Sequence, residues 1–408
     1  MSEKMRARSS LAGIEVPVIG SDTVKWHQVA VPSTSAALPP PQPFAPSTED
    51  AASCSIVGSP PTYFIWRTHK IRPRLLEIVE FCAYKEFPRI GLRLEFPDSL
   101  SPFAVICENK TNNLSGNPYM LYAVTVSGVA YLIRLKNVDN YASCSIFPPN
   151  EVIEFNLQTY PHYGAITAMA ASSECLVIGG NDGSVGCFQL GMLDLSAPGF
   201  LHELRDDAGF GRLWGLVSRS RVVAAVHDMV ISCVARKKLL FVLHSDGILR
   251  VWDLSNSSRI FSHAMNTPAL AGATSVRLWL GEAHNDTSSI PLAILYKRTL
   301  DSSMEMISIS ILHFTSGDRI VLSLEPSMQD ISLEEGGVID VNLTSNKIWI
   351  LKEDGMVMQE LFGPKENRGV AQCFALQEAF VADQLFQSSE HSSDDLLWLA
   401  HSLFSSSK

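Results

Sequence analysis

The stretch Leu240–Leu254 reads LFVLHSDGILRVWDL: two apolar runs joined by an Asp-Gly turn. Asp-Gly and Ser-Gly pairs favour the positive φ that a tight hairpin turn requires, so this stretch predicts a β-hairpin. The same pattern recurs in Leu121–Leu135 (LYAVTVSGVAYLIRL), Cys175–Leu190 (CLVIGGNDGSVGCFQL) and Ile348–Phe362 (IWILKEDGMVMQELF). The four copies therefore predict one structural unit that is repeated along the chain.

The spacing of these copies indicates the kind of repeat. The turn glycines are Gly128, Gly183, Gly247 and Gly355, which gives intervals of 183−128 = 55, 247−183 = 64 and 355−247 = 108 residues. The last interval equals two of 54. A hairpin repeat of this length is typical of a β-propeller, in which each blade is a small antiparallel sheet.

Two less regular copies complete the series. Pro291–Phe314 holds two apolar runs around a longer polar turn at Arg298–Ser303, and Tyr63–Arg67 with Leu75–Cys82 forms a further pair upstream. A single hairpin cannot bury both of its faces, so we expect the copies to stack side by side and share a core.

The copy around Asp246 also resembles a WD-type blade. It ends in Trp252-Asp253, and His227 precedes it, so Asp, His and Trp side chains could hydrogen-bond across the hairpin. The alternative is that Asp-Gly is merely a common turn and Trp252 merely a core aromatic. The other copies lack the Trp-Asp ending, which predicts a diverged, WD-like propeller. We expect the following residues to have structural roles in the blade turns: Gly128, Asp182, Gly183, Asp246, Gly247, Trp252, Asp354 and Gly355.

The chain divides into three predicted segments. Residues 1–60 contain a proline-rich stretch from Pro32 to Pro46, which favours a flexible arm. Residues 61–369 form the predicted propeller, with a helical insert expected at Leu193–Arg221 from its helix-period apolar positions. Residues 370–408 form a predicted helical insertion, in which Val370–Phe386 is rich in helix formers and Ser393 resembles a helix cap.

Composition argues against several classes of activity. The 408 residues are 46% hydrophobic and 18% charged with a net charge of −10, a balance that disfavours binding to a phosphate backbone as the main activity. The eight cysteines include no C-x-x-C pair and the eleven histidines no H-x-x-x-H pair. We find no phosphate-binding loop, nucleophile elbow or run of eighteen uncharged apolar residues. We therefore predict no catalytic residue, no cofactor, no metal site, no small-molecule substrate and no membrane span.

Taken together, the chain resembles the 160-kilodalton nucleoporin family, called the 120-kilodalton nucleoporin in fungi. Four motifs carry the resemblance, and their order along the chain is specific although each is modest. They are Tyr63–Arg67, Arg93–Pro97, Arg212–Trp214, and Leu240–Leu254 preceded by Val226-His227. The resemblance covers Thr62 to Lys408.

The resemblance implies a seven-bladed propeller with helical insertions, followed in the family by a long helical domain. It also implies a scaffold without catalysis in the outer-ring (Y) complex of the nuclear pore, at the nuclear envelope. Such a subunit supports pore assembly, mRNA export and protein transport, and its partners are other outer-ring nucleoporins. Since this chain ends at Lys408, inside the expected helical insertion, we expect an incomplete propeller and a truncated product.

Two other interpretations remain open from the residues alone. A WD-like propeller could serve as an adaptor of another complex, such as a ubiquitin ligase substrate receptor, and would then bind clients outside the pore. An enzyme would require ionisable residues from several blades to converge on the central channel with strongly shifted pKa values.

Overall fold

The structure is a computed structural model in which only part of the chain is described. The described residues are 24–33, 51–57, 62–82, 90–109, 117–157, 166–172, 175–189, 200–204, 224–265, 272–281, 283, 288–298, 304–315, 317, 319–325, 329–334, 337–343, 347–352 and 355–361. They are almost entirely β-strand, with two short 3-10 helices, η1 (Val138–Tyr141) and η2 (Pro149–Glu151). None of their helices is long and apolar enough to cross a lipid bilayer.

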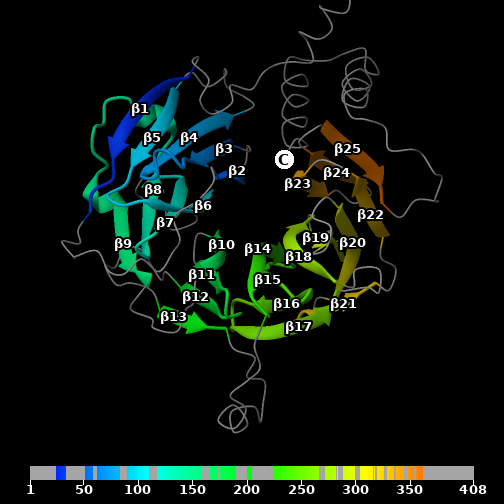
Figure 1. Ribbon diagram of the computed structural model, residues 1–408. Coiled ribbons are helices and arrows are strands. Elements are labelled where there is room, and N and C mark those ends of the chain that lie inside the picture. Colours follow the sequence, from blue (N-terminus) through cyan, green and yellow to red (C-terminus); the bar gives the residue numbers. More distant parts are fainter. Residues whose placement is uncertain are drawn as a thin grey trace, which may run out of the picture. The chain divides into compact units, whose positions relative to one another are not determined.

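The strands form six sheets, which we name A to F in chain order (Figure 1). Sheet A contains β1 (Lys25–Ala30), β2 (Ala51–Val57), β3 (Thr62–Thr68), β4 (Leu75–Cys82) and β5 (Ile90–Glu95). Sheet B contains β6 (Leu100–Glu108), β7 (Tyr119–Thr125), β8 (Val129–Leu135) and β9 (Val152–Asn156). Sheet C contains β10 (Ile166–Ser172), β11 (Cys175–Gly180), β12 (Val185–Gln189) and β13 (Phe200–Glu203).

Sheets D, E and F complete the series. Sheet D contains β14 (Val226–Val234), β15 (Lys237–His244), β16 (Ile248–Asp253) and β17 (Ser258–Ala264). Sheet E contains β18 (Ala273–Leu280), β19 (Ser289–Arg298), β20 (Met304–Thr315), β21 (Val321–Leu324) and β22 (Gln329–Glu334). Sheet F contains β23 (Val338–Leu343), β24 (Lys347–Lys352) and β25 (Gly355–Glu360). Neighbouring strands within a sheet are antiparallel except β1 and β5, which pair in parallel.

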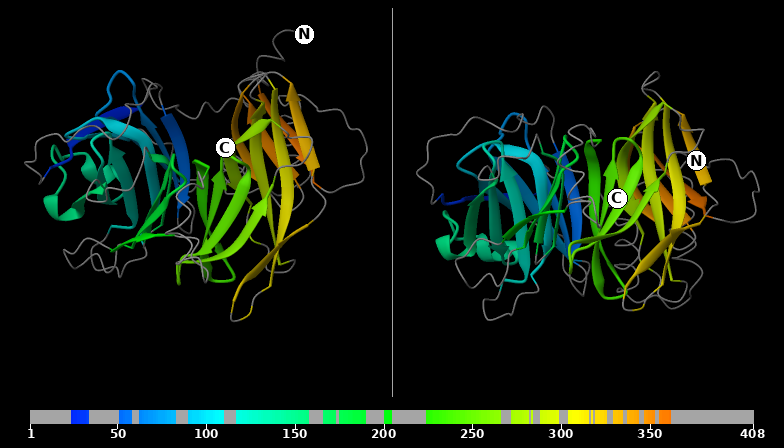
Figure 2. Two further views of the ribbon diagram at one scale, coloured as in Figure 1. Left: turned by 60° about the horizontal axis from the view of Figure 1, so that its bottom comes forward. Right: turned by 90° about the horizontal axis from the view of Figure 1, so that it is seen from below.

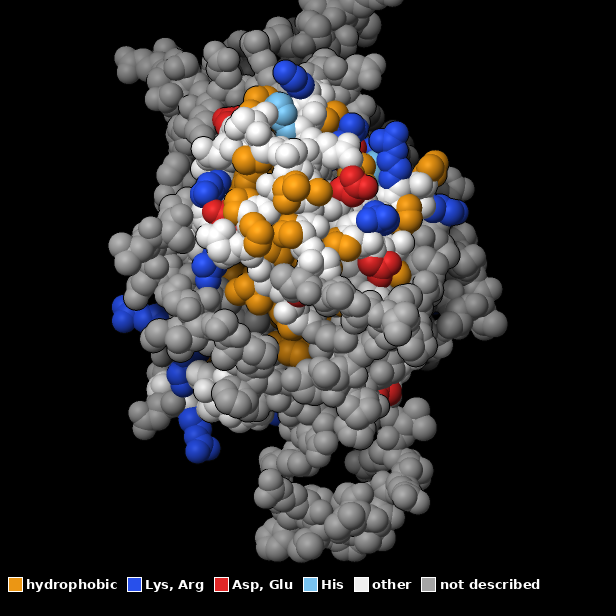
Figure 3. All heavy atoms as spheres, turned by 90° about the vertical axis from the view of Figure 1, so that its left-hand side faces the viewer, with side chains coloured by type: hydrophobic (Ala, Val, Ile, Leu, Met, Phe, Trp, Pro, Cys, Tyr) orange, Lys and Arg blue, Asp and Glu red, His pale blue; other side chains and the backbone are white. Residues whose placement is uncertain are grey.

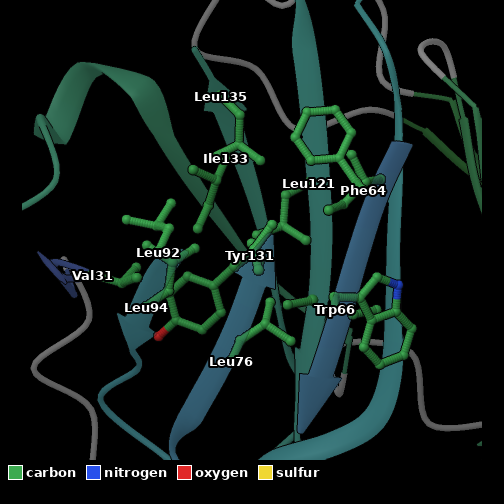
Figure 4. Packing of buried hydrophobic residues seen from close by; sticks show 14 of the residues in the cluster. Val31, Phe64, Trp66, Leu76, Leu92, Leu94, Leu121, Tyr131, Ile133 and Leu135 are labelled. Carbon is green, nitrogen blue, oxygen red and sulfur yellow. The ribbon is translucent and has the colours of Figure 1, made fainter. Parts of the chain in front are cut away.

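The chain separates into two compact units. Among the described residues, unit 1 contains sheets A and B, and unit 2 contains sheets C to F. In unit 1, β2 of sheet A contacts β6 of sheet B. An apolar core lies between these two sheets and includes Phe64, Leu76, Leu94 and Tyr131 (Figure 4). Each sheet thus buries a face that would be exposed if it stood alone.

The described part of residues 1–60 differs from the predicted flexible arm. Lys25–Ala30 and Ala51–Val57 are the two edge strands of sheet A, on either side of the predicted hairpin strands. Val29 is fully buried in the A–B core, and Val31, just after β1, is 4% exposed. Short segments on both sides of the prolines therefore join a sheet, although the composition of the region as a whole suggests an arm.

In unit 2, consecutive sheets lie side by side through their first strands (Figures 1 and 2). β10 contacts β14, β14 contacts β18, and β18 contacts β23. Separate apolar cores fill the spaces between sheets C and D, between D and E, and between E and F. This succession of small sheets joined along equivalent strands is the arrangement expected of propeller blades.

Strand β15 shows why a second strand of these sheets carries a continuous apolar run, here Leu239–Leu243. Its alternate residues Leu240 and Val242 belong to the core shared with sheet C. Phe241 and Leu243 belong to the core shared with sheet E. A strand covered on both faces needs a continuous apolar run and not the alternation of a half-exposed strand.

All six predicted hairpins are formed. They are β3–β4, β7–β8, β11–β12, β15–β16, β19–β20 and β24–β25, each with antiparallel register. The predicted helical insert at Leu193–Arg221 is wrong in part, because Phe200–Glu203 is β13, the edge strand of sheet C. Its helix-period positions from Phe210 to Val217 lie outside the described residues, as do the helices predicted in residues 370–408.

Candidate functional site

Three of the predicted turn glycines occupy equivalent positions. Gly128, Gly183 and Gly247 have φ values of 81°, 81° and 76°, in the left-handed region that side chains rarely adopt. Each glycine N–H donates to the carbonyl three residues earlier, on Thr125 (3.0 Å), Gly180 (3.1 Å) and His244 (2.9 Å). This is the geometry of a turn that ends in a left-handed glycine, one residue longer than the two-residue turn that the Asp-Gly pair suggested.

The aspartates of two turns hold their own loops. Asp182 Oδ1 accepts hydrogen bonds from Ser184 N (3.0 Å) and Ser184 Oγ (2.6 Å). Asp246 Oδ1 accepts one from Ile248 N (3.1 Å). The fourth turn is different, because Gly355 is already the first residue of β25 and pairs with Lys352; Asp354 lies outside the described residues.

The WD-type network predicted across the β15–β16 hairpin is not formed as expected. Trp252 is 2% exposed and packs in the core between sheets C and D, and its Nε1 has no hydrogen-bond partner in the described part of the chain. The His227 ring bonds through Nδ1 to the carbonyl of Ser275 in sheet E. The cause is a bulge between Val226 and Asp228, which redirects His227 from its own hairpin to the next sheet.

A series of polar contacts joins neighbouring sheets from C to F, and most of them link first strands. The Thr167 hydroxyl donates to Val226 O between sheets C and D, and the Ser275 hydroxyl donates to His244 O between D and E. Between E and F, Trp279 Nε1 donates to Asp340 Oδ1 at 2.8 Å. Two more hydrogen bonds, from the His227 ring to Ser275 O and from Leu278 N to Asp228, connect sheets D and E. We call all of these contacts the intersheet links.

Bulges in the first strands make these links possible. The register shifts between Ile166 and Ala168, Val226 and Asp228, Ser275 and Arg277, and Val338 and Asp340. A bulge leaves one residue outside the regular ladder and turns its polar group sideways. Sequence reasoning missed the links because hairpin patterning concerns the second and third strands of each sheet.

Asp228 has the most strongly desolvated carboxyl group among the links. Its Oδ2 accepts from Leu278 N at 2.8 Å, and its Oδ1 accepts from Met229 N at 2.8 Å. Burial raises the pKa of Asp228, and the two backbone N–H groups offset only part of that effect. The carboxyl group therefore works as a hydrogen-bond acceptor between sheets D and E.

Sheet A carries a different charged cluster around Glu77, which is 1% exposed. Arg93 Nη2 lies 2.8 Å from Glu77 Oε1, and Arg67 Nη2 and His69 Nε2 lie 3.2 Å and 2.8 Å from Oε2. The Arg93 guanidinium also stacks over Trp26 of β1, 4.7 Å from the ring centroid. Burial alone would raise the pKa of Glu77, but hydrogen bonds and charges from His69 and Arg93 lower it below its usual value.

These groups link strands and sheets, and their arrangement does not point to catalysis. No group of three or more His, Cys, Asp or Glu side chains that could hold a metal ion occurs within the described ranges. The clustered ionisable groups have protein partners that account for their positions. Recognition of a partner also depends on the outer surface.

Few large apolar side chains are exposed on that surface. Among the described residues they are Ile71 (92% exposed), Ile146 (61%) and Val321 (60%). Figure 3 shows a face on which hydrophobic side chains are bordered by lysine and arginine side chains. Ile71 lies within the run His69–Arg74 (HKIRPR), and such a basic run in an acidic chain is a signal that sequence analysis could have used.

Comparison with known proteins gives a consistent result. A family model described as "Nucleoporin Nup120/160, beta-propeller domain" matches residues 62–401. The "Nuclear pore complex protein NUP160" of Arabidopsis thaliana is 41% identical over 411 residues, covering 98% of this chain. The chain spans 27% of that relative's length.

Solved structures with some similarity include propeller proteins, at low identity. The β-propeller domain of Cps50 (Swd1) from Myceliophteria thermophila matches with a TM-score of 0.42 and 9% identity, over 74% of this chain and 84% of that one. BamB from Moraxella catarrhalis matches with a TM-score of 0.35 and 13% identity, over 74% and 82%. The fold assignment rests on the family match and on the sheets themselves.

Proposed function

The chain belongs to the nucleoporin Nup120/160 family, and from this premise we propose that it is a scaffold subunit of the nuclear pore outer ring. In this role it binds other outer-ring nucleoporins through the surface of its β-propeller. It acts at the nuclear envelope and supports pore assembly, mRNA export and protein transport. The observation that carries the proposal is the family match over residues 62–401, with 41% identity to a plant NUP160.

The geometry supports a structural role in two ways. The predicted turn residues and the intersheet links hold strands in place, with Trp279 to Asp340 and Leu278 to Asp228 both at 2.8 Å. The charged cluster of sheet A is centred on Glu77, and the guanidinium groups of Arg67 and Arg93 lie within 3.2 Å of that carboxylate. Because these polar side chains bond to other strands of the same chain, they favour a rigid binding module over an enzyme.

The adaptor hypothesis is not favoured. A WD-like adaptor of a ubiquitin ligase would bind clients outside the pore, whereas the family match is to nucleoporins. We also propose that the chain needs no cofactor and acts without catalysis.

The proposal can be tested by the location and the partners of the chain in cells. A fluorescently tagged chain should give a nuclear-rim signal and should co-purify with outer-ring subunits of the pore. The matched control is the same tagged chain carrying Phe241→Ala and Phe64→Ala, which removes two fully buried core side chains and should abolish both signals. A folded wild-type chain that is diffuse and purifies without pore subunits would contradict the proposal.

A further inference from the structure

The loop between β3 and β4 presents an unusual apolar side chain. Ile71 is 92% exposed, and residues 70–74 that surround it are all exposed. Lys70 and Arg72 flank it directly, and Arg74 follows three residues later. The loop therefore combines an aliphatic tip with a positive border, in a chain whose net charge is −10.

This loop is held rigidly by its backbone. Three successive carbonyl groups accept hydrogen bonds: Arg72 O from Leu75 N (3.0 Å), Pro73 O from Leu100 N (2.6 Å) and Arg74 O from Phe96 N (2.8 Å). Arg74 Nε also donates to Phe96 O at 2.8 Å. Because the loop is fixed before any contact is made, binding through Ile71 would lose little conformational entropy.

A second exposed isoleucine lies at the same end of sheet A. Leu75, which follows the loop, pairs with Glu95, Glu95 pairs with Ala30, and Ala30 forms a bridge to Ile146. Three strand spacings of about 4.8 Å place Leu75, where the loop ends, roughly 15 Å from Ile146. The two most exposed large apolar side chains of the described residues thus lie along one end of one sheet.

The charges at this end restrict the kind of partner. The cations of the loop favour carboxylates, but Glu95 and Asp98 also lie at this end of the sheet. A lipid surface binds through larger sets of basic and aromatic side chains than this end presents. A protein surface can match a mixed charge pattern and enclose single aliphatic side chains.

We propose that the end of sheet A formed by Ile71, Arg72 and Ile146 docks an acidic amphipathic helix of another protein. A spacing of roughly 15 Å corresponds to about ten residues of a helix, so one helix can contact both isoleucines. Its carboxylates face Arg72 and lie away from Glu95 and Asp98, and its apolar stripe covers Ile71. The inference rests on the proposed scaffold function, since it describes one contact that such a scaffold makes.

The test measures binding of the purified 408-residue chain to a synthetic helical peptide of about 18 residues, with leucines on one face and glutamates beside them. A second peptide has lysines in place of the glutamates. Fluorescence anisotropy should show preference for the glutamate peptide, and Ile71→Asp and Arg72→Glu should each weaken that binding about tenfold. Arg72→Glu should also reduce the preference for glutamate over lysine.

The matched control is Val321→Asp, which changes an aliphatic side chain of 60% exposure on β21. It should leave peptide binding unchanged. Because Ile71, Arg72 and Val321 are all exposed, thermal melting of the three variants should match the wild type, which excludes loss of fold as a cause.

Three results would overturn the inference. They are absence of binding to the glutamate peptide, an equal loss with Val321→Asp, and binding only to vesicles of equal parts phosphatidylcholine and phosphatidylserine. The last result would assign this end of the sheet to a membrane surface. A wild-type chain that reaches the nuclear rim but ignores the peptide would remove this inference and leave the proposed function standing.

Discussion

Glu77 in unit 1 and Asp228 in unit 2 show two ways of enclosing a carboxylate. Glu77 is surrounded by the side chains of Arg67, Arg93 and His69, and its pKa is lowered. Asp228 is held by the backbone N–H groups of Met229 and Leu278, and burial raises its pKa. At Glu77 the hydrogen bonds and charges of the neighbouring side chains outweigh the cost of desolvation, whereas at Asp228 the two N–H groups and the charge of Arg277 do not.

This difference follows from what each carboxylate joins. Glu77 connects β3, β4 and β5 within sheet A, where long side chains from neighbouring strands reach a common point. Asp228 connects β14 to β18 of the next sheet, where it accepts from the backbone N–H of Leu278. Stability should therefore respond to pH in opposite directions in the two units.

The largest effect should come from the apolar cores, which are alike in the two units. Phe64→Ala removes a fully buried ring that packs 4.6 Å from the Tyr119 ring, and should lower the free energy of unfolding by about 3–5 kcal/mol. Phe241→Ala should have a similar cost in unit 2. Hydrogen exchange followed by mass spectrometry should report the first loss in sheets A and B and the second in sheets D and E. Equal deprotection of both units by either variant would mean that the units are not separate in stability.

Removing the carboxylate of Asp228 should have the next largest effect. Asp228→Ala leaves the N–H groups of Leu278 and Met229 without their acceptor, which should cost about 2–4 kcal/mol in denaturant unfolding. Asp228→Asn, which keeps one acceptor oxygen, is the control and should cost less.

The pH dependence of Asp228 sharpens this prediction. A raised folded-state pKa means that the native state binds more protons than the unfolded state between the ordinary value of 3.8 and the folded value. The contribution of Asp228 is present below the unfolded pKa and is lost as pH rises through the folded pKa. The stability of the wild type relative to Asp228→Asn should therefore fall as pH rises above about 4. A difference that is independent of pH would contradict the assignment.

Glu77→Gln should show the opposite pH dependence with a smaller cost, about 1–3 kcal/mol at neutral pH, because the arginines that lose their counter-charge are partly exposed. A lowered folded-state pKa gives stability that is present above the ordinary value of 4.5 and is lost as pH falls through the folded value. The difference between wild type and Glu77→Gln should therefore shrink in acid. Urea titrations at several pH values would measure it, and a difference that grows in acid would refute the ion-pair account.

The smallest effect should come from a turn. Gly247→Ala places a side chain at φ 76° and should cost about 1 kcal/mol in thermal unfolding. Gly247→Asn should cost less, since asparagine tolerates this conformation. A neutral Gly247→Ala would show that the turn relaxes without strain.

The sequence was sufficient to predict the hairpins and the propeller class. Strands such as β15 and β19 carry long apolar runs, and the turn glycines recur at intervals that propellers share. Patterns of this kind depend on neighbouring residues only, so a single sequence contains them.

Other features depend on contacts between distant segments. Thr167 and Asp228 look like ordinary polar residues until a bulge turns them toward the next sheet. Strand β1 pairs with β5, more than sixty residues away, and its proline-rich neighbourhood obscures it. The sequence around Trp252 predicted a polar network, but the indole ring packs in the core between sheets C and D. Its role depends on the side chains that the neighbouring sheet brings against it, which the local sequence does not contain.

The double-sided burial of β15 has a consequence for how the gene can change. Inserting one codon within this strand would exchange every later side chain between its two neighbouring cores, so that Phe241 would enter the space now filled by Leu240 or Val242. Inserting two codons would restore the facing of each later residue. Length variation inside such strands should therefore be rare and even-numbered, whereas turns can vary by single residues.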